Sequence, residues 1–158
     1  MHERVALVRP LERLAQEKSL SPKLNMIRII KSTRAIHAKA AEDLHKQIFP
    51  RQIAFPKKDL LWVVIDDDVV GYATAREVKQ ELKLTMCGIA EEYRGLKLQR
   101  RLIRARYNYA KRNALQRVVT YTTTNPPSEN NLIDCGFKLY RPKNKWAGAY
   151  ANYWYKNI

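Results

Sequence analysis

Glycine and cysteine are scarce in this chain, which contains five and two of them among 158 residues. Cys87 and Cys135 lack the spacing of metal ligands. We interpret them as reduced thiols, although the sequence leaves a disulfide open. The three histidines also lack metal spacing, so no metal site is predicted. No apolar run reaches the ~20 residues that cross a membrane, and the N-terminus lacks the features of a secretory signal. We therefore expect a cytoplasmic protein.

Acidic residues are also few: 15 Asp and Glu stand against 30 Lys and Arg, so the net charge is +15 and the pI is about 10.0. Such a surface attracts polyanions, and nucleic acid is the first candidate partner. An anionic cofactor needs only a small share of this charge, and a solubilising surface explains it equally well. The hydrophobic fraction of 46% is enough for the core of one domain.

Hydrophobic patterning predicts an N-terminal extension over residues 1–24 and one domain over 25–158. Its elements follow the order strand, helix, three strands, helix, strand, helix, two strands. The expected strands are 26–31, 60–65, 69–77, 82–89, 117–123, 137–140 and 149–155, and the expected helices are 35–48, 99–113 and 128–134. This order is typical of a mixed α/β (α+β) fold in which helices flank a largely antiparallel sheet.

The segment 93–99, YRGLKLQ, joins a predicted strand to a strongly basic predicted helix. The start of a helix presents unpaired backbone N–H groups and the positive end of the helix dipole, so this turn is a candidate phosphate site. Apolar residues form two stripes along the helix, and five cationic residues lie on the opposite side. These cations form either a solvated helix face or a row that binds phosphates of a cofactor or of nucleic acid. Arg106 falls between the apolar stripes, so we expect it to snorkel to solvent or to meet an acceptor.

Three motifs between residues 60 and 155 resemble the GNAT superfamily of acetyl-coenzyme A-dependent acyltransferases. The first is EEYRG at 91–95, after a strand and before a helix. The second is the strand VVTY at 118–121, which leads to Asn125. The third is NNLIDCGF at 130–137, similar to the asparagine, short helix and Gly-Phe ending of the family. The resemblance implies the GNAT fold and acetyl-coenzyme A as cofactor.

The family's phosphate turn reads Arg/Gln-x-x-Gly-x-Gly/Ala. Arg94 matches its first residue, whereas Lys97 and Gln99 replace both glycines. Glycines there let backbone amides approach a pyrophosphate closely. The resemblance implies that the amides of Cys87, Gly88 and Ile89 hold the acetyl and pantetheine arm. The implied pyrophosphate and cofactor contacts are Arg94, Gly95, Leu96, Lys97, Leu98, Gln99, Arg100, Arg101 and Asn131.

Catalytic residues are less well defined by the resemblance. Many family members place a tyrosine, as general acid, where this chain has Leu132, whereas Asn125 matches a family asparagine. Candidate substitute acids are Tyr121, Tyr140 and Cys135, although Tyr121 also fits a core-facing strand residue and Cys135 a small buried hydrophobe. Glu77, near a strand end, is a candidate general base. Positioning an amine against a thioester can also supply much of the rate without either group.

The resemblance and the charge together predict an acetyl-coenzyme A-dependent N-acyltransferase. Backbone amides of a strand would polarise the thioester carbonyl of its cofactor. The charge favours an acceptor that is, or is attached to, DNA or RNA; DNA-base modification of the kind that phages encode fits this description. The alternative is a GNAT-fold module that has lost its chemistry and binds nucleic acid. A cationic polyamine or antibiotic acceptor is disfavoured by charge repulsion. The aromatic C-terminal segment 145–155 is interpreted either as a core strand or as a base-stacking surface.

Overall fold

The computed structural model describes residues 26–49 and 53–158. The predicted extension, residues 1–24, lies outside these residues. The described strands are β1 (Arg28–Ser32), β2 (Leu60–Asp66), β3 (Asp68–Val78), β4 (Glu81–Ile89), β5 (Arg117–Thr122), β6 (Lys138–Tyr140) and β7 (Asn152–Asn157). The helices are α2 (Ala38–Ile48), α3 (Leu98–Arg112), α4 (Pro126–Asp134) and the short 3-10 helix η1 (Glu91–Tyr93). The predicted order of elements is confirmed.

The strands form one seven-stranded sheet in the order β1-β2-β3-β4-β5-β7-β6. All neighbouring strands are antiparallel except β4 and β5, which run parallel. Parallel neighbours need a crossover connection, and α3 provides it between β4 and β5. The mixed, largely antiparallel fold predicted from the sequence is therefore confirmed.

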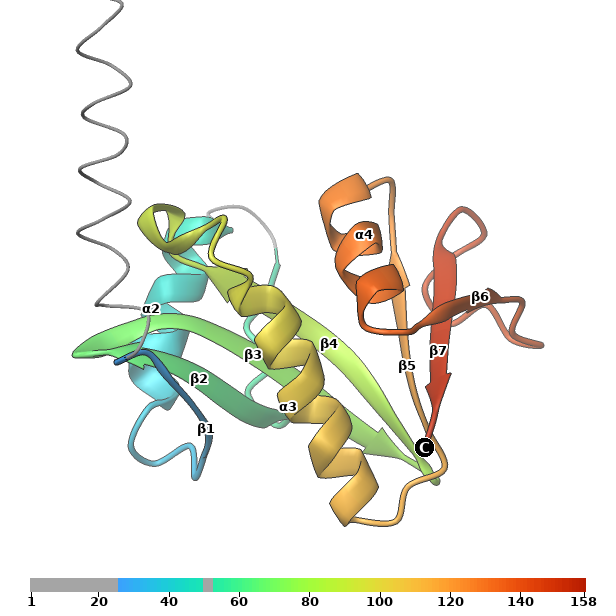
Figure 1. The fold of residues 1–158 in the computed structure, drawn as a ribbon, viewed down its shortest axis with the longest axis horizontal. Coiled ribbons are helices and arrows are strands. Elements are labelled where there is room, and N and C mark those ends of the chain that lie inside the picture. Colours follow the sequence, from blue (N-terminus) through green and yellow to red (C-terminus); the bar gives the residue numbers. More distant parts are fainter. Residues whose placement is uncertain (1–25, 50–52) are drawn as a thin grey trace, which may run out of the picture.

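The helices cover opposite faces of the sheet, with α2 on one face and α3 on the other (Figure 1). Alternation along β2 explains this arrangement, because successive side chains of a strand point to opposite faces. Trp62 and Val64 pack in the core beneath α3, whereas Leu61 and Val63 pack in the core beneath α2. Helix α4 lies on the α3 side, where Leu132 and Phe137 join the same core as Trp62.

The starts of α2, α4 and β7 lie two or three residues from the expected positions. Arg34 adopts a positive φ of 67°, and residues 35–37 after it form a turn, so helix α2 begins only at Ala38. Helix α4 begins at Pro126 rather than at residue 128, with Asn125 as its N-cap. The last strand begins only at Asn152, since residues 141–151 form a loop.

Strands β4 and β5 pair over only three residues and then separate. The register runs from Glu81 opposite Arg117 to Lys83 opposite Val119. Beyond it, a side chain bridges the strands: the Thr120 hydroxyl donates a hydrogen bond to the Leu84 carbonyl oxygen at 3.2 Å. Figure 1 shows the two strands diverging from the end where they pair. This divergence opens the sheet next to α3 and α4.

Candidate active site

A β-bulge shapes the β4 edge of this opening. Ala73 on β3 pairs with Cys87 on β4, and Ala75 pairs with Leu84. Between these two pairs β4 therefore carries one extra residue. The Thr74 hydroxyl oxygen accepts a hydrogen bond from the Met86 N–H at 3.0 Å, and the Thr74 and Thr85 hydroxyls lie 2.7 Å apart. Thr85 in turn donates to the Asp59 carboxylate at 2.7 Å. These bonds fix the irregular backbone beside the opening.

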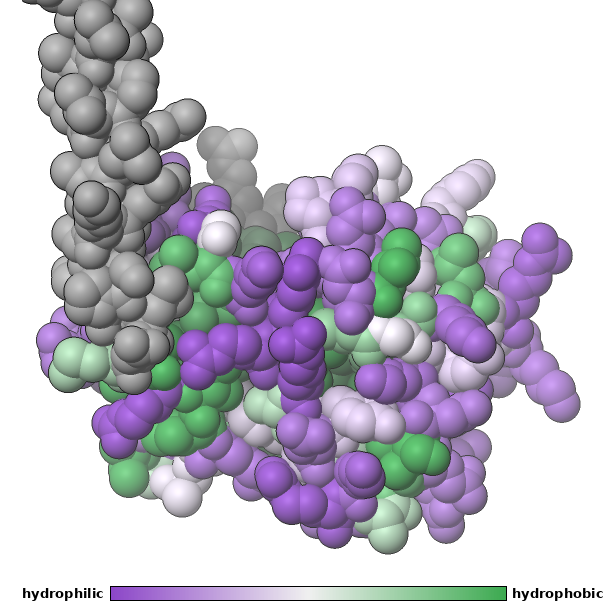
Figure 2. All heavy atoms as spheres, in the orientation of Figure 1, coloured by the Kyte–Doolittle hydropathy of each residue, from purple (hydrophilic) through white to green (hydrophobic). Residues whose placement is uncertain are grey.

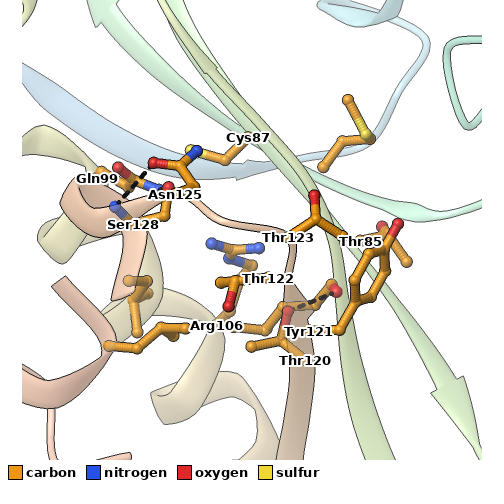
Figure 3. A pocket seen from close by; sticks show the side chains of 14 residues that line it. Thr85, Cys87, Gln99, Arg106, Thr120, Tyr121, Thr122, Thr123, Asn125 and Ser128 are labelled. Carbon is orange, nitrogen blue, oxygen red and sulfur yellow. Dashed lines mark hydrogen bonds between the residues drawn. The ribbon is translucent and has the colours of Figure 1, made fainter. Parts of the chain in front are cut away.

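The opening is a cavity of about 220 Å³ between β4 and β5 (Figure 3). Its walls are largely hydroxyls, amides and apolar side chains, and Arg106 is the one charged residue that the described part of the chain contributes to them. The lining residues are Leu84, Thr85, Met86, Cys87, Gln99, Ile103, Arg106, Thr120, Tyr121, Thr122, Thr123, Asn125, Ser128 and Leu132. Such a cavity suits a narrow, mostly uncharged group better than a metal ion.

A second hollow of about 600 Å³ lies at the start of α3. Turn residues from Arg94 to Arg100 form one wall, and Pro127, Asn130 and Asn131 form the other. No side chain of the described residues caps this helix start, so its first N–H groups are free to bind an anion. Lys97, at the glycine position of the family motif, adopts a left-handed φ of 59°. The backbone therefore keeps the conformation that glycine favours.

Helices α3 and α4 are joined by polar bonds beside the hollows. Asn131 donates to the Gln99 side-chain oxygen at 2.8 Å and accepts from Arg100 Nε at 2.9 Å. Arg100 also forms an ion pair with Asp134. Gln99 lines both the cavity and the hollow, so the two are neighbours. A ligand anchored at the start of α3 can extend from there into the cavity.

Most of the predicted cofactor residues surround these two spaces. Cys87 and Gln99 line the cavity, and Ile89, Arg94, Gly95, Lys97, Leu98, Gln99, Arg100 and Asn131 line the hollow. Leu96, between two of these turn residues, packs against the core beneath α3. Gly88 and Arg101 line neither space. A Cβ at Gly88 would lie 2.6 Å from Tyr72 Cε1, on the α2 side, and Arg101 donates to the Ile27 carbonyl oxygen at 3.3 Å.

The predicted catalytic residues divide into two groups. Asn125 and Tyr121 line the cavity. Asn125 also accepts a hydrogen bond from the Ser128 N–H at 3.3 Å. Glu77 lies elsewhere and accepts a hydrogen bond from the Tyr109 hydroxyl at 2.5 Å. Tyr140 packs edge-on against Tyr153 and Tyr155 on β7.

Neither cysteine is placed as a reactive thiolate. Burial raises the pKa of the Cys87 thiol, and it also raises the pKa of Cys135. The Cys135 thiol contacts the Arg100 carbonyl oxygen at 3.9 Å, outside the cavity. Both cysteines are free. Because a thiolate is the nucleophilic form, this environment disfavours a covalent cysteine intermediate.

The cavity contains residues that were not assigned to a site from the sequence: Thr85, Thr120, Thr122, Ser128 and Arg106. The threonines belong to strand segments whose alternation indicates only a pleated sheet. Arg106 did carry a signal, because a cation stood between apolar stripes. It does not snorkel: it is 3% exposed and donates to the carbonyl oxygens of Leu102 and Thr74.

Within the described residues, no cluster of three or more His, Cys, Asp or Glu side chains is placed to hold a metal, and no helix is long and apolar enough to cross a membrane. A search of curated protein sequences finds no match.

Solved structures show where this fold occurs. An acetyltransferase of the GNAT family from Staphylococcus aureus matches with a TM-score of 0.66 and 15% identity, covering 83% of this chain and 98% of its own. The ribosomal-protein-S18-alanine N-acetyltransferase of Escherichia coli matches with a TM-score of 0.69 and 12% identity, covering 84% and 94%. Arabidopsis thaliana NAA60 in complex with acetyl-CoA matches with a TM-score of 0.66 and 15% identity, covering 84% and 99%.

Sequence comparison extends this similarity of fold to family membership. The family model described as Acetyltransferase (GNAT) family matches residues 26–137, which include β1 to β5, α4 and the cavity between β4 and β5. This chain belongs to the GNAT family of acetyltransferases.

Proposed function

We propose that this protein transfers an acyl group from acetyl-coenzyme A to an amine. The observation that carries the proposal is the position of the cavity between β4 and β5. It adjoins the uncapped start of α3, which has the geometry of a phosphate site. A phosphate-bearing cofactor held at α3 would place its far end between the diverging strands.

The residues present fit this cofactor. Two glycines of the family's phosphate turn are absent, yet Lys97 keeps the left-handed backbone conformation and adds a positive charge beside the free N–H groups. Leu98, Gln99 and Arg100 would offer those N–H groups to the pyrophosphate. When bound, acetyl-coenzyme A supplies an acyl group activated as a thioester.

The backbone around the β4 bulge would orient and polarise the acyl carbonyl. Fixed amides that point at a developing oxyanion stabilise it in a water-poor site. The Tyr121 hydroxyl is the candidate proton donor in the cavity lining, since the tyrosine position of the family is occupied by Leu132. No carboxylate of the described residues lines the cavity. An acceptor amine would therefore react mainly through positioning.

The acceptor that we propose is an amine on nucleic acid or on a nucleic-acid-bound protein. Tyr121 connects the cavity to what we call the aromatic surface, formed by Tyr121, Tyr140 and Trp146, with the buried Tyr153 packed beneath Tyr140 and Trp146. Lys83 Nζ lies 4.0 Å from the Trp146 ring centroid, and the Arg117 guanidinium lies 5.1 Å from that of Tyr140. Aromatic rings beside cations suit stacked bases and phosphates. We propose the cytoplasm as the location.

The experiment that tests this function is calorimetric titration of the purified protein with acetyl-coenzyme A at low salt. We expect one site per chain. Lys97→Gln should weaken binding by roughly three- to tenfold, because it removes a charge beside the pyrophosphate site. Arg112→Gln removes an equal charge from the exposed far end of α3 and should leave binding unchanged. Absence of binding by the unmodified protein would refute the proposal.

A GNAT fold that has lost its chemistry and only binds nucleic acid is the competing function. The two glycine replacements favour it, whereas the retained turn conformation favours the enzyme. Radiolabelled acetyl-coenzyme A, incubated with the protein and pools of RNA, DNA or basic proteins, separates the two. Label that enters one pool identifies the acceptor class, whereas gel-shift binding with neither cofactor binding nor transfer supports the binding module.

A further inference from the structure

Arg106 places a positive charge inside the cavity with no negative partner among the described residues. Its side chain projects from α3, and the residue is 3% exposed. Figure 3 shows its guanidinium among the side chains that line the cavity. None of the ion pairs formed by residues 26–49 and 53–158 includes Arg106. A buried cation normally has a carboxylate or phosphate as partner.

The contacts of Arg106 leave part of its hydrogen-bonding capacity unused. Its Nε donates to the Leu102 carbonyl oxygen at 3.1 Å, and one terminal nitrogen donates to the Thr74 carbonyl oxygen at 3.0 Å. A guanidinium has five N–H donors in a planar fork that matches a carboxylate. The two backbone contacts orient this fork, so Arg106 is held ready for an anion.

We infer that the Arg106 guanidinium binds a carboxylate at the end of the donor's acyl group, so that the preferred donor belongs to the class of succinyl- or malonyl-coenzyme A. This inference rests on the proposed function, because it assumes that a coenzyme A thioester enters the cavity. It keeps coenzyme A as the carrier and replaces the acetyl group of the proposed donor with a dicarboxylic acyl group.

The connection between the two spaces assigns the carboxylate to the donor rather than to the acceptor. The cavity that contains Arg106 shares Gln99 with the hollow at the start of α3. Arg106 and the start of α3 also belong to the same helix, on the same side of the sheet. The aromatic surface that we propose for the acceptor reaches the cavity through Tyr121, on the β5 side.

A purely structural role for Arg106 predicts different behaviour. In that case its bond to Thr74 would anchor α3 to β3, and the charge would be incidental. An apolar side chain of similar length would then change stability but not the choice of ligand. The two roles therefore differ in how affinity depends on the acyl group, which can be measured without catalysis.

The test compares succinyl- with butyryl-coenzyme A, because butyryl has the same chain length and lacks the carboxylate. Acetyl-coenzyme A and free coenzyme A complete the series. In calorimetric titrations we expect succinyl-coenzyme A to bind at least about tenfold more tightly than butyryl-coenzyme A, as for a charge-assisted hydrogen bond. In Arg106→Met this preference should disappear, while affinity for free coenzyme A stays within about twofold of the original.

Each outcome bears on one proposal or on both. Equal binding of succinyl- and butyryl-coenzyme A by the unmodified protein would overturn the inference and leave the proposed function intact. A preference for succinyl-coenzyme A that persists in Arg106→Met would have the same meaning. No binding of any coenzyme A would overturn both. If Arg106→Met does not fold, Arg106→Lys keeps the charge but lacks the fork, and a reduced preference for succinyl is expected there.

Discussion

At the scale of single residues, Lys97 shows how a motif can change while its geometry persists. A left-handed backbone conformation is unfavourable for a residue with a Cβ, and glycine avoids this strain. Lys97 adopts this conformation nonetheless, with a φ of 59°, because it is the residue that joins the turn to the first residue of α3. The motif mismatch that we noted in the sequence therefore places a lysine in a backbone conformation that glycine favours.

Replacing Lys97 by glycine should therefore stabilise the protein. We expect the free energy of unfolding in urea to rise by about 1 kcal/mol, as the relief of left-handed strain exceeds the added entropy of the unfolded chain. Lys97→Ala is the matched control, because alanine loses the same side chain but keeps the strain. Equal stabilities of the glycine and alanine variants would show that the turn is not strained at this position.

At the scale of elements, the bulge in β4 links the sheet to the cavity. Asp59 holds it from outside the strand: its carboxylate accepts from Thr85 at 2.7 Å and from Arg76 Nε at 2.9 Å. The Asp59 side chain is only 1% exposed, so water cannot readily replace a lost partner. Asp59 and Thr85 are distant in sequence, and only the fold brings them together.

Thr85→Val should test this link, because valine matches the shape of threonine but has no hydroxyl. Loss of the hydroxyl leaves one Asp59 oxygen without its donor and the Thr74 O–H without its acceptor, so we expect the free energy of unfolding to fall by about 1–3 kcal/mol. Acetyl-coenzyme A should also bind more weakly. Thr85→Ser keeps the hydroxyl and should lose much less. Chemical unfolding in which the two variants behave alike would contradict a role for this bond.

At the scale of the whole molecule, the net charge of +15 is distributed over several elements. Arg104, Lys111 and Arg112 are exposed on α3, and Lys143 and Lys145 are exposed on the loop before β7. Figure 2 shows a largely hydrophilic face over α3. The loop differs from α3 in that it carries Trp146, whose ring packs against the cavity residue Tyr121. We therefore expect the proposed acceptor to contact the loop.

Binding of a labelled single-stranded oligonucleotide should consequently weaken as salt rises. A double change of Lys143 and Lys145 to glutamine should reduce the slope of log affinity against log salt by about 1.4, as two phosphate contacts predict. The same change of Lys111 and Arg112 on α3 is the control and should leave the slope unchanged. Fluorescence anisotropy measures both. The opposite pattern would move the nucleic-acid contact to α3.

The C-terminal aromatic segment shows why sequence alone left two interpretations open. The core-strand interpretation is confirmed for Trp154, which is 3% exposed. The base-stacking interpretation stays a prediction, and Trp146 lies against Lys83 on the loop before β7. Trp154 faces the core because of its position on β7, whereas the path of the loop before β7 places Trp146. Periodicity reports which face a strand residue takes, but it does not describe an irregular loop.

The sequence by itself determined the order of elements, the two-faced packing of the sheet, the turn before α3 and the family. Each depends on neighbours along the chain, because periodicity and helix starts are local properties. Only the tertiary structure decided that β4 and β5 separate, that Tyr121 and Asn125 share a cavity which Glu77 and Tyr140 do not line, and that Arg106 faces into it. These features depend on residues brought together from separate strands and helices, which spacing in a sequence does not specify.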